Sequence, residues 1–310
     1  MRIIYMGTPE FAIPGLKILL ENHYTIAAVV TAPDKPRGRG QQISFTPVKE
    51  LALSHQLLVL QPQHLKDPGF VSTVVDLAPD LIIVVAFRIL PKEIFTIPRY
   101  GSFNLHASLL PRYRGAAPIN WAIMDGQQET GVTSFLLRET VDTGSILLQA
   151  RVRIGADETA GELHDKLSLI GAEIVLQTVR LFELGKAHPR PQDDTLATPA
   201  PKIFKENCKI EWNNSAERVF DFVRGLSPLP CAWTVHEGRI LRIYRSAVVQ
   251  STDSPSKVPG TLITVTKNQL VVACAQSALS IIEIQQEGKK RMSIEDFLRG
   301  YKLEAGTILG

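Results

Sequence analysis

The sequence predicts an α/β protein: a doubly wound, mostly parallel Rossmann-like sheet followed by a smaller β-barrel domain. Three observations support this class. Apolar strand-like runs alternate with helical patterns through residues 1–188, as in parallel sheets covered on both faces. Four prolines and no apolar period follow in 188–201, which indicates a linker. Short strand-like runs then fill 208–310, separated in several places by Gly, Pro or Asn, as in a small barrel.

The first domain contains both helix signals and strand signals. Thr46 and Pro47 begin a helix, because a hydroxyl caps the first turn and proline suits its first position. A long helix is predicted from Thr159 to Leu184, with Thr159 as its cap and Gly185 as its end. The run Asp80–Phe87 is apolar throughout, as a central parallel strand should be. Other predicted strands are "RIIYM", "YTIAAVVT", "GSFNLH", "GVTSFLL" and "SILLQARV".

The second domain reads as strands with one or two helices. A short helix is predicted near Ser215–Arg224. The segment "CKIEW" precedes this helix, and the predicted strands after it are "RILRIYRSAVV", "GTLITV", "QLVVACA" and "ALSIIEIQ". We therefore predict a first domain at 1–188, a linker at 189–207 and a second domain at 208–310.

Composition narrows the class of protein further. No apolar run approaches the roughly 20 residues that span a bilayer, and the N-terminus lacks a signal-peptide pattern, so we expect a cytoplasmic protein. Cys208, Cys231 and Cys274 are far apart, which predicts buried or half-buried thiols and no metal site. The net charge of +3 arises entirely within 189–310, which favours a polyanionic partner there. Nothing in the sequence requires more than a monomer.

Two segments near the N-terminus bear on ligands. "GTPEF" (Gly7–Phe11) has one glycine where a dinucleotide fingerprint needs three, so we expect no NAD. The segment Thr31–Pro47 is predicted to be a long loop carrying three cations: Lys35, Arg37 and Arg39. It is either a solvated loop or one that orders on a phosphate backbone.

The stretch "SFNLHASLLPRYRGAAPI" contains the main candidate site. In an extended chain Asn104 and His106 point to the same face, at the carboxyl end of an apolar strand. Two donors that converge on one oxygen can stabilise an oxyanion. A structural role for the pair is the alternative, but the position at a strand end favours function.

A carboxylate is needed to orient the imidazole. Asp142, in the "VDTGS" turn between two predicted strands, is the best candidate, and Glu139 is the alternative. The chain has no G-x-S-x-G elbow, H-E-x-x-H motif or P-loop. Asn, His and Asp without a nucleophile suit direct transfer between two bound substrates.

These motifs closely resemble the 10-formyltetrahydrofolate-dependent formyltransferases. The shared features are the Asn-x-His pair, the S-L-L-P-x-x-R-G loop and the D-T-G aspartate. "GTPEFA", "APDKPRGRGQQ", "KIEWNNSAERV" and "EGKKRMSIEDFL" extend the resemblance over nearly the whole chain, to bacterial members that act on initiator methionyl-tRNA. It implies the formyltransferase fold, an OB-like C-terminal barrel that binds tRNA, and 10-formyltetrahydrofolate as co-substrate without metal or NAD.

The resemblance also implies roles for residues. Asn104, His106 and Asp142 match the catalytic positions, and Arg39 matches a loop arginine that contacts the acceptor stem. Ser108, Leu109, Leu110 and Pro111 match the folate-binding loop. One departure is "VVAFRILP", in which Phe87 replaces the usual Tyr and a Gly-Leu pair is shortened to Arg88.

Charge then suggests which residues face tRNA. The candidates for phosphate contact are Lys35, Arg37, Arg39, Lys202, Lys205, Lys209, Arg242, Arg245, Lys289, Lys290 and Arg291.

Two alternative functions remain. One is formyl transfer to a small acceptor in place of tRNA, and the other is a nucleic-acid-binding module without catalytic activity.

Overall fold

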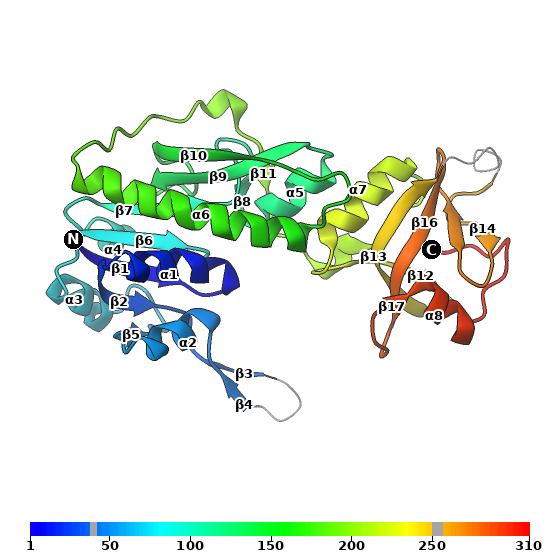
Figure 1. Cartoon of the computed structure of the whole chain (residues 1–310), viewed down its shortest axis with the longest axis horizontal. Helices are drawn as coiled ribbons and strands as arrows, with labels where there is room; N and C mark the ends of the chain where they lie inside the picture. Colours follow the sequence, from blue (N-terminus) through cyan, green and yellow to red (C-terminus); the bar gives the residue numbers. More distant parts are fainter. Residues whose placement is uncertain (38–41, 250–256) are drawn as a thin grey trace. The chain divides into compact units, whose positions relative to one another are not determined.

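The computed structural model describes residues 1–37, 42–249 and 257–310, and the chain folds into two compact units. Both are shown in Figure 1, and each is described by itself. Unit 1 comprises Met1–Gly115, Thr130–Val152 and His164–Pro199, and unit 2 comprises Ala116–Glu129, Arg153–Leu163 and Ala200–Gly310. The units interleave in sequence, and the contiguous boundaries 1–188 and 208–310 stay a prediction.

A seven-stranded sheet forms the centre of unit 1. Its strand order is β10-β9-β7-β6-β1-β2-β5, with β1, β2, β5, β6 and β7 in parallel contacts and β9 antiparallel to β7. The predicted mostly parallel sheet is confirmed. The strands are β1 (Arg2–Gly7), β2 (Thr25–Val30), β5 (Val59–Leu60), β6 (Leu81–Val85), β7 (Ser102–His106), β9 (Glu129–Leu136) and β10 (Ile146–Arg153).

Helices cover both faces of this sheet. Phe70 of α3 and Ile94 of α4 share a buried cluster with Ile4 and Ile82 on one face. On the other face the Tyr5 hydroxyl donates to the Ala12 carbonyl (2.6 Å) ahead of α1, and α6 crosses the same side (Figure 1). The helices are η1 (Glu10–Ala12), α1 (Ile13–Glu21), α2 (Pro47–Ser54), α3 (Pro68–Asp76), α4 (Lys92–Phe95) and α6 (Ala160–Glu183).

Glycine allows the close approach of α6 to β7. A Cβ on Gly171 would lie 2.6 Å from Leu105 Cδ2, so a larger residue there would have to displace the Leu105 side chain or the helix. Leu105 therefore fixes one face of β7 against α6, and Asn104 and His106 occupy the opposite face. Both predicted caps are confirmed: the Thr46 hydroxyl accepts from Lys49 N (3.2 Å), and Thr159 caps α6.

Unit 2 is built on an antiparallel sheet with helices packed around it. The strand order is β12-β13-β16-β15-β14, and β17 pairs with β16. Cys208, Cys231 and Cys274 are buried free thiols, as predicted, and burial raises the pKa of Cys231 to about 11 and that of Cys274 to about 12. The strands are β12 (Ala232–His236), β13 (Arg239–Val249), β14 (Leu262–Val265), β15 (Leu270–Ala273), β16 (Ala278–Gln286) and β17 (Met292–Ser293). The helices are α5 (Pro118–Met124), α7 (Ala216–Leu226) and α8 (Ile294–Gly300).

One prediction of local structure is wrong. The segment Thr31–Pro47 is not a loop throughout, since β3 (Lys35–Arg37) pairs with β4 (Gln42–Ser44). The segment "CKIEW" begins at the last residue of η3 (Lys205–Cys208), and a single bridge joins Lys209 to Trp233. The remaining short elements are β8 (Arg114–Gly115), β11 (Pro199–Ala200) and η2 (Asp194–Leu196).

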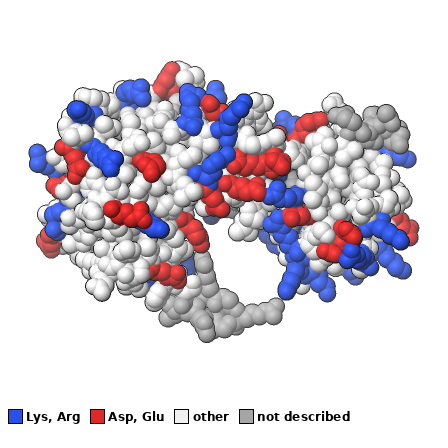
Figure 2. Space-filling view, viewed as in Figure 1, with Lys and Arg blue, Asp and Glu red and all other residues white. Residues whose placement is uncertain are grey.

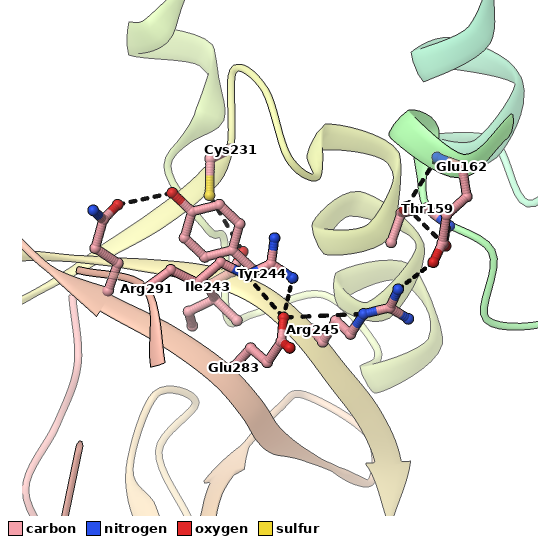
Figure 3. A network of polar contacts seen from close by, with 9 residues as sticks. Thr159, Glu162, Cys231, Ile243, Tyr244, Arg245, Glu283 and Arg291 are labelled. Atoms are coloured by element: carbon pink, nitrogen blue, oxygen red, sulfur yellow. Dashed lines mark hydrogen bonds and ion pairs between the residues drawn. The ribbon is translucent and has the colours of Figure 1, made fainter. Parts of the chain in front are cut away.

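A polar network in unit 2 begins at the cap of α6 and continues onto β13 and β16 (Figure 3). Glu162 Oε2 accepts from the Thr159 backbone N–H (2.8 Å) and hydroxyl (2.9 Å), and Glu162 Oε1 pairs with Arg245. Arg245 also approaches Glu283 (4.0 Å), which Arg291 engages. The Thr159 backbone N–H is the main cause that holds the pKa of Glu162 below its usual range, and Arg245 adds to the shift.

Because the pKa of Glu162 is lower in the folded protein, its charge stabilises the fold above the unfolded-state pKa of about 4.3. That stabilisation is lost as pH falls through the folded-state pKa. We expect Glu162→Gln to lower the free energy of unfolding by about 0.5–1 kcal/mol at pH 7, a small effect because the side chain is 49% exposed.

Thermal unfolding measured at pH 7 and pH 3 tests this expectation, with Glu287→Gln as the control, an exposed carboxylate without an ion pair to any other described residue. The Glu162→Gln difference should shrink at pH 3. A difference that is the same at both pH values would show that the charge is irrelevant.

Candidate functional site

Strand β7 presents the two polar residues that the sequence singled out. It lies between β6 and β9, with Asn104 opposite Val84 and Phe135 in register. The Asn104 side chain is half-buried and makes no hydrogen bond with any other described residue. Its amide is therefore available to a ligand at the carboxyl end of β7.

His106 is buried, with a relative exposure of 6%, and its ring is oriented by the chain that follows β7. Nε2 lies 2.8 Å from the Tyr113 carbonyl oxygen. A carbonyl only accepts, so Nε2 carries the proton and donates it there. Nδ1 is the remaining ring nitrogen, and it lies 3.9 Å from Asp142 Oδ2. The imidazole can therefore exchange a proton with a ligand only at Nδ1.

Asp142 is held beside this ring by the backbone. Its Oδ2 accepts a hydrogen bond from the Gly115 N–H (2.9 Å), and its side chain is 10% exposed. Asp142 has a φ of +55°, a left-handed conformation that Asp tolerates better than most residues. His106 and Asp142 thus lie side by side at the end of β7, and Asn104 is on the same face of that strand as His106.

The alternative carboxylate, Glu139, has a different partner. Its Oε1 lies 2.6 Å from Lys92 Nζ, and its side chain is 66% exposed. The hydrogen bond from Lys92 lowers the pKa of Glu139. Glu139 is therefore engaged at the surface.

Gln192 is a positioning residue that sequence reasoning missed. Its Nε2 donates to the carbonyl oxygens of Asp142 and Gly144 (both 2.8 Å), and its Oε1 accepts from Arg114 Nη2 (2.7 Å). Gln192 thereby joins the aspartate turn to the loop after β7. No sequence signal marks it, because it lies in the proline-rich linker.

The segment Ser108–Pro111 is rigidly held. Ser108 and Leu110 are buried, and Thr133 donates to the Ser108 carbonyl (2.6 Å). Gln149 Nε2 donates to the Leu110 carbonyl (2.9 Å). With these polar groups satisfied inside the protein, the segment offers mainly the half-buried Leu109 and Pro111 to a ligand.

Arg88, where the sequence departs from the family pattern, has a structural role. Its guanidinium donates to the carbonyls of Pro62 (2.7 Å) and Gln63 (2.9 Å). Burial lowers the pKa of Arg88. It stacks near Phe87, with 5.2 Å from Cζ to the ring centroid. The shortened segment is thus tied to the chain that follows β5.

The candidate tRNA-facing cations have different surroundings. Lys35 is exposed. For Arg37 the structure describes only the backbone, and Arg39 lies outside the described residues. Arg245 and Arg291 are engaged by Glu162 and Glu283, so they are less available to phosphate. Lys202, Lys205, Lys209, Lys289 and Lys290 are exposed, and Arg242 is half-buried.

Unit 2 presents Lys and Arg side chains gathered along its lower side in Figure 2.

Within residues 1–37, 42–249 and 257–310, no group of His, Cys, Asp and Glu is arranged to hold a metal ion. No helix in those ranges is long and apolar enough to cross a membrane.

Comparison with known proteins identifies relatives of both parts of the chain. Residues 1–179 match the family described as formyl transferase, and residues 202–302 match the formyl transferase C-terminal domain. The chain is 48% identical to methionyl-tRNA formyltransferase of Caldanaerobacter subterraneus subsp. tengcongensis and 47% identical to that of Alkaliphilus oremlandii. Both alignments cover 100% of each chain.

Solved structures show the same fold. HypX from Aquifex aeolicus, in complex with tetrahydrofolic acid, matches with a TM-score of 0.67 at 17% identity. The match covers 99% of this chain and 50% of that one, so the chain spans about half the length of HypX.

Proposed function

The chain belongs to the formyltransferase family, and from this membership we propose that it transfers the formyl group of 10-formyltetrahydrofolate to the α-amino group of initiator methionyl-tRNA. The full-length similarity to methionyl-tRNA formyltransferases supports the acceptor. The observation that carries the chemistry is the placement of Asn104 and His106 on one face of β7, with Asp142 beside His106 at the end of that strand.

We propose that His106 acts first as a base. Because the Nε2–H donates a hydrogen bond to the Tyr113 carbonyl, the neutral ring has its lone pair on Nδ1. The free pKa of an α-amine is about 7.7–8.0, so part of the acceptor is protonated at pH 7. Nδ1 takes a proton from the amine, and Asp142 stabilises the imidazolium that results.

The neutral amine then attacks the formyl carbon. A new bond joins nitrogen to carbon, and the formyl oxygen becomes an oxyanion. The Asn104 amide and the Nδ1–H of His106 donate to that oxygen. As the intermediate collapses, the attacking nitrogen loses its extra proton, the bond from carbon to N10 of the folate breaks, and N10 takes up that proton. His106 then releases the proton on Nδ1 to solvent, which restores the base. The products are N-formylmethionyl-tRNA, which serves translation initiation, and tetrahydrofolate.

The role of the Ser108–Pro111 segment follows from its contacts. Its internal hydrogen bonds support a rigid, mainly apolar wall against the folate, formed by Leu109 and Pro111. The exposed cations Lys35, Lys202, Lys205, Lys289 and Lys290, together with Arg37 and Arg39, are proposed to meet tRNA phosphates. The protein is proposed to act as a cytoplasmic monomer.

A formylation assay tests the assignment. The protein is incubated with 10-formyltetrahydrofolate and either initiator methionyl-tRNA or small amines, such as glycinamide ribonucleotide and amino-sugar nucleotides. We expect methionyl-tRNA alone to become formylated. Formylation of a small amine in its place would establish the rival acceptor, and no formylation of any acceptor would refute catalysis.

A further inference from the structure

Unit 2 contains a cavity of about 340 Å³ that takes no part in the proposed chemistry. Its lining comes from the end of α5 with Asp125 after it, from the segments before, within and after η3, and from α7. The family similarity assigns no ligand to it. Pockets for small ligands have volumes of about 300–1,000 Å³, so this cavity is large enough for one small ligand.

Two aromatic residues line the cavity. Trp121 on α5 is half-buried, and its indole N–H donates to the Pro201 carbonyl (2.8 Å), which fixes the ring. Phe222 on α7 is also half-buried and lies among the apolar lining residues. A fixed indole and a second aromatic ring in the lining provide surfaces on which a base can stack.

Charged groups complete the lining. Lys202, Lys209 and Arg218 are exposed, and none of them forms an ion pair with another described residue. Arg224, on the same helix as Arg218, is by contrast buried and paired with Asp221 (2.7 Å). The cations bordering the cavity are therefore free to bind an anion.

Two carboxylates, Asp125 and Glu211, also line the cavity. A site for a simple anion would not have carboxylates in its lining. A purely apolar ligand would use neither these two carboxylates nor the three cations Lys202, Lys209 and Arg218. A nucleotide matches the whole set. Its base offers a flat surface, its amino groups donate to carboxylates, and its phosphate accepts from Lys and Arg.

We infer that this cavity binds one unpaired nucleotide of the methionyl-tRNA acceptor. The base lies against Trp121 and Phe222, and the phosphate pairs with Lys202, Lys209 and Arg218. This inference rests on the proposed function, because it takes the tRNA substrate as the source of the nucleotide. It adds an anchoring site outside the catalytic residues.

Equilibrium binding of methionyl-tRNA to two Trp121 variants tests the stacking. Trp121→Leu removes the aromatic ring, and Trp121→Phe keeps a ring but loses the N–H bond to Pro201. We expect Leu to raise Kd at least about tenfold, the scale of one base–aromatic stack, and Phe to raise it much less. Equal weakening by both variants would trace the effect to the Pro201 bond and overturn the inference.

The charge component is tested in the full-length protein by Lys209→Gln, with Lys267→Gln as the matched control. Lys267 is an exposed lysine of the same unit that does not line the cavity. We expect Lys209→Gln to reduce the slope of log Kd against log salt by about 0.7–0.9, and Lys267→Gln to leave the slope unchanged. Equal slopes for the two variants would contradict a phosphate at the cavity.

Nucleoside 5′-monophosphates distinguish a free nucleotide from the tRNA. If they bind wild type with micromolar Kd while the Trp121 variants bind methionyl-tRNA normally, the cavity serves a free nucleotide and the inference fails. Failure of wild type to formylate methionyl-tRNA would instead refute the proposed function. Thermal unfolding of each variant confirms that it is folded.

Discussion

Replacing Asn104 by Ala is expected to lower kcat for methionyl-tRNA formylation by about 10²–10³-fold, the usual effect of losing one oxyanion donor. Because the Asn104 side chain makes no hydrogen bond with other described residues, the thermal unfolding temperature should stay the same. His106→Ala should lower kcat at least as much, since it removes both the base and a donor.

Purified variants assayed at saturating substrates, with unfolding temperatures measured in parallel, check this expectation. Glu139→Gln is the control, because Glu139 lies in the segment between β9 and β10 that also holds Asp142 but is paired with Lys92 at the surface. Near-normal turnover by Asn104→Ala would remove Asn104 from the proposed chemistry. A matching loss in Glu139→Gln would point to a general disturbance of that segment.

Several strands and helices could be predicted because their signals are local. The uninterrupted apolar run at β6 indicates a strand buried on both faces, and the caps Thr46 and Thr159 act within one turn of their helices. The pairing of β3 with β4 could not be predicted in the same way. Its segment is rich in glycine, proline and charge, and that composition resembles a loop.

The candidate site was predictable to the extent that its side chains follow strand periodicity. Asn104 and His106 share a face because they are two residues apart in β7. The tautomer of His106 was not predictable, since it depends on the Tyr113 carbonyl, which reaches the ring only after the chain turns. The role of Gln192 depends on contacts some 50 residues away, and no local pattern encodes them.

Outside the catalytic side chains, the substitution expected to affect stability and kcat most is Gly144→Ala. Gly144 lies two residues after Asp142. A Cβ at this position would overlap the carbonyl oxygen of Leu136 in β9 and lie 3.2 Å from Phe135 Cδ2. The overlapped atom belongs to backbone, so no rotamer change relieves the contact. Gly144→Ala must therefore displace the turn, and we expect a loss of about 1–3 kcal/mol in the free energy of unfolding.

The same displacement should reach the chemistry. Gln192 holds the Asp142 and Gly144 carbonyls together, and Gly115 fixes the Asp142 carboxylate, so a shift at Gly144 moves the carboxylate relative to His106. A misplacement of about 1 Å can cost a hundredfold in rate, and we expect kcat to fall by about tenfold to a hundredfold.

Denaturant unfolding and kcat measured on the folded fraction separate the two effects. Gly300→Ala makes the same chemical change in α8, where a Cβ would meet no atom within 4 Å, and it should leave both quantities nearly unchanged. If Gly144→Ala lowers stability but leaves kcat of the folded enzyme intact, the position of Asp142 does not depend on this turn. If both fall while Gly300→Ala is neutral, the turn holds the carboxylate in place for catalysis as well as packing against β9.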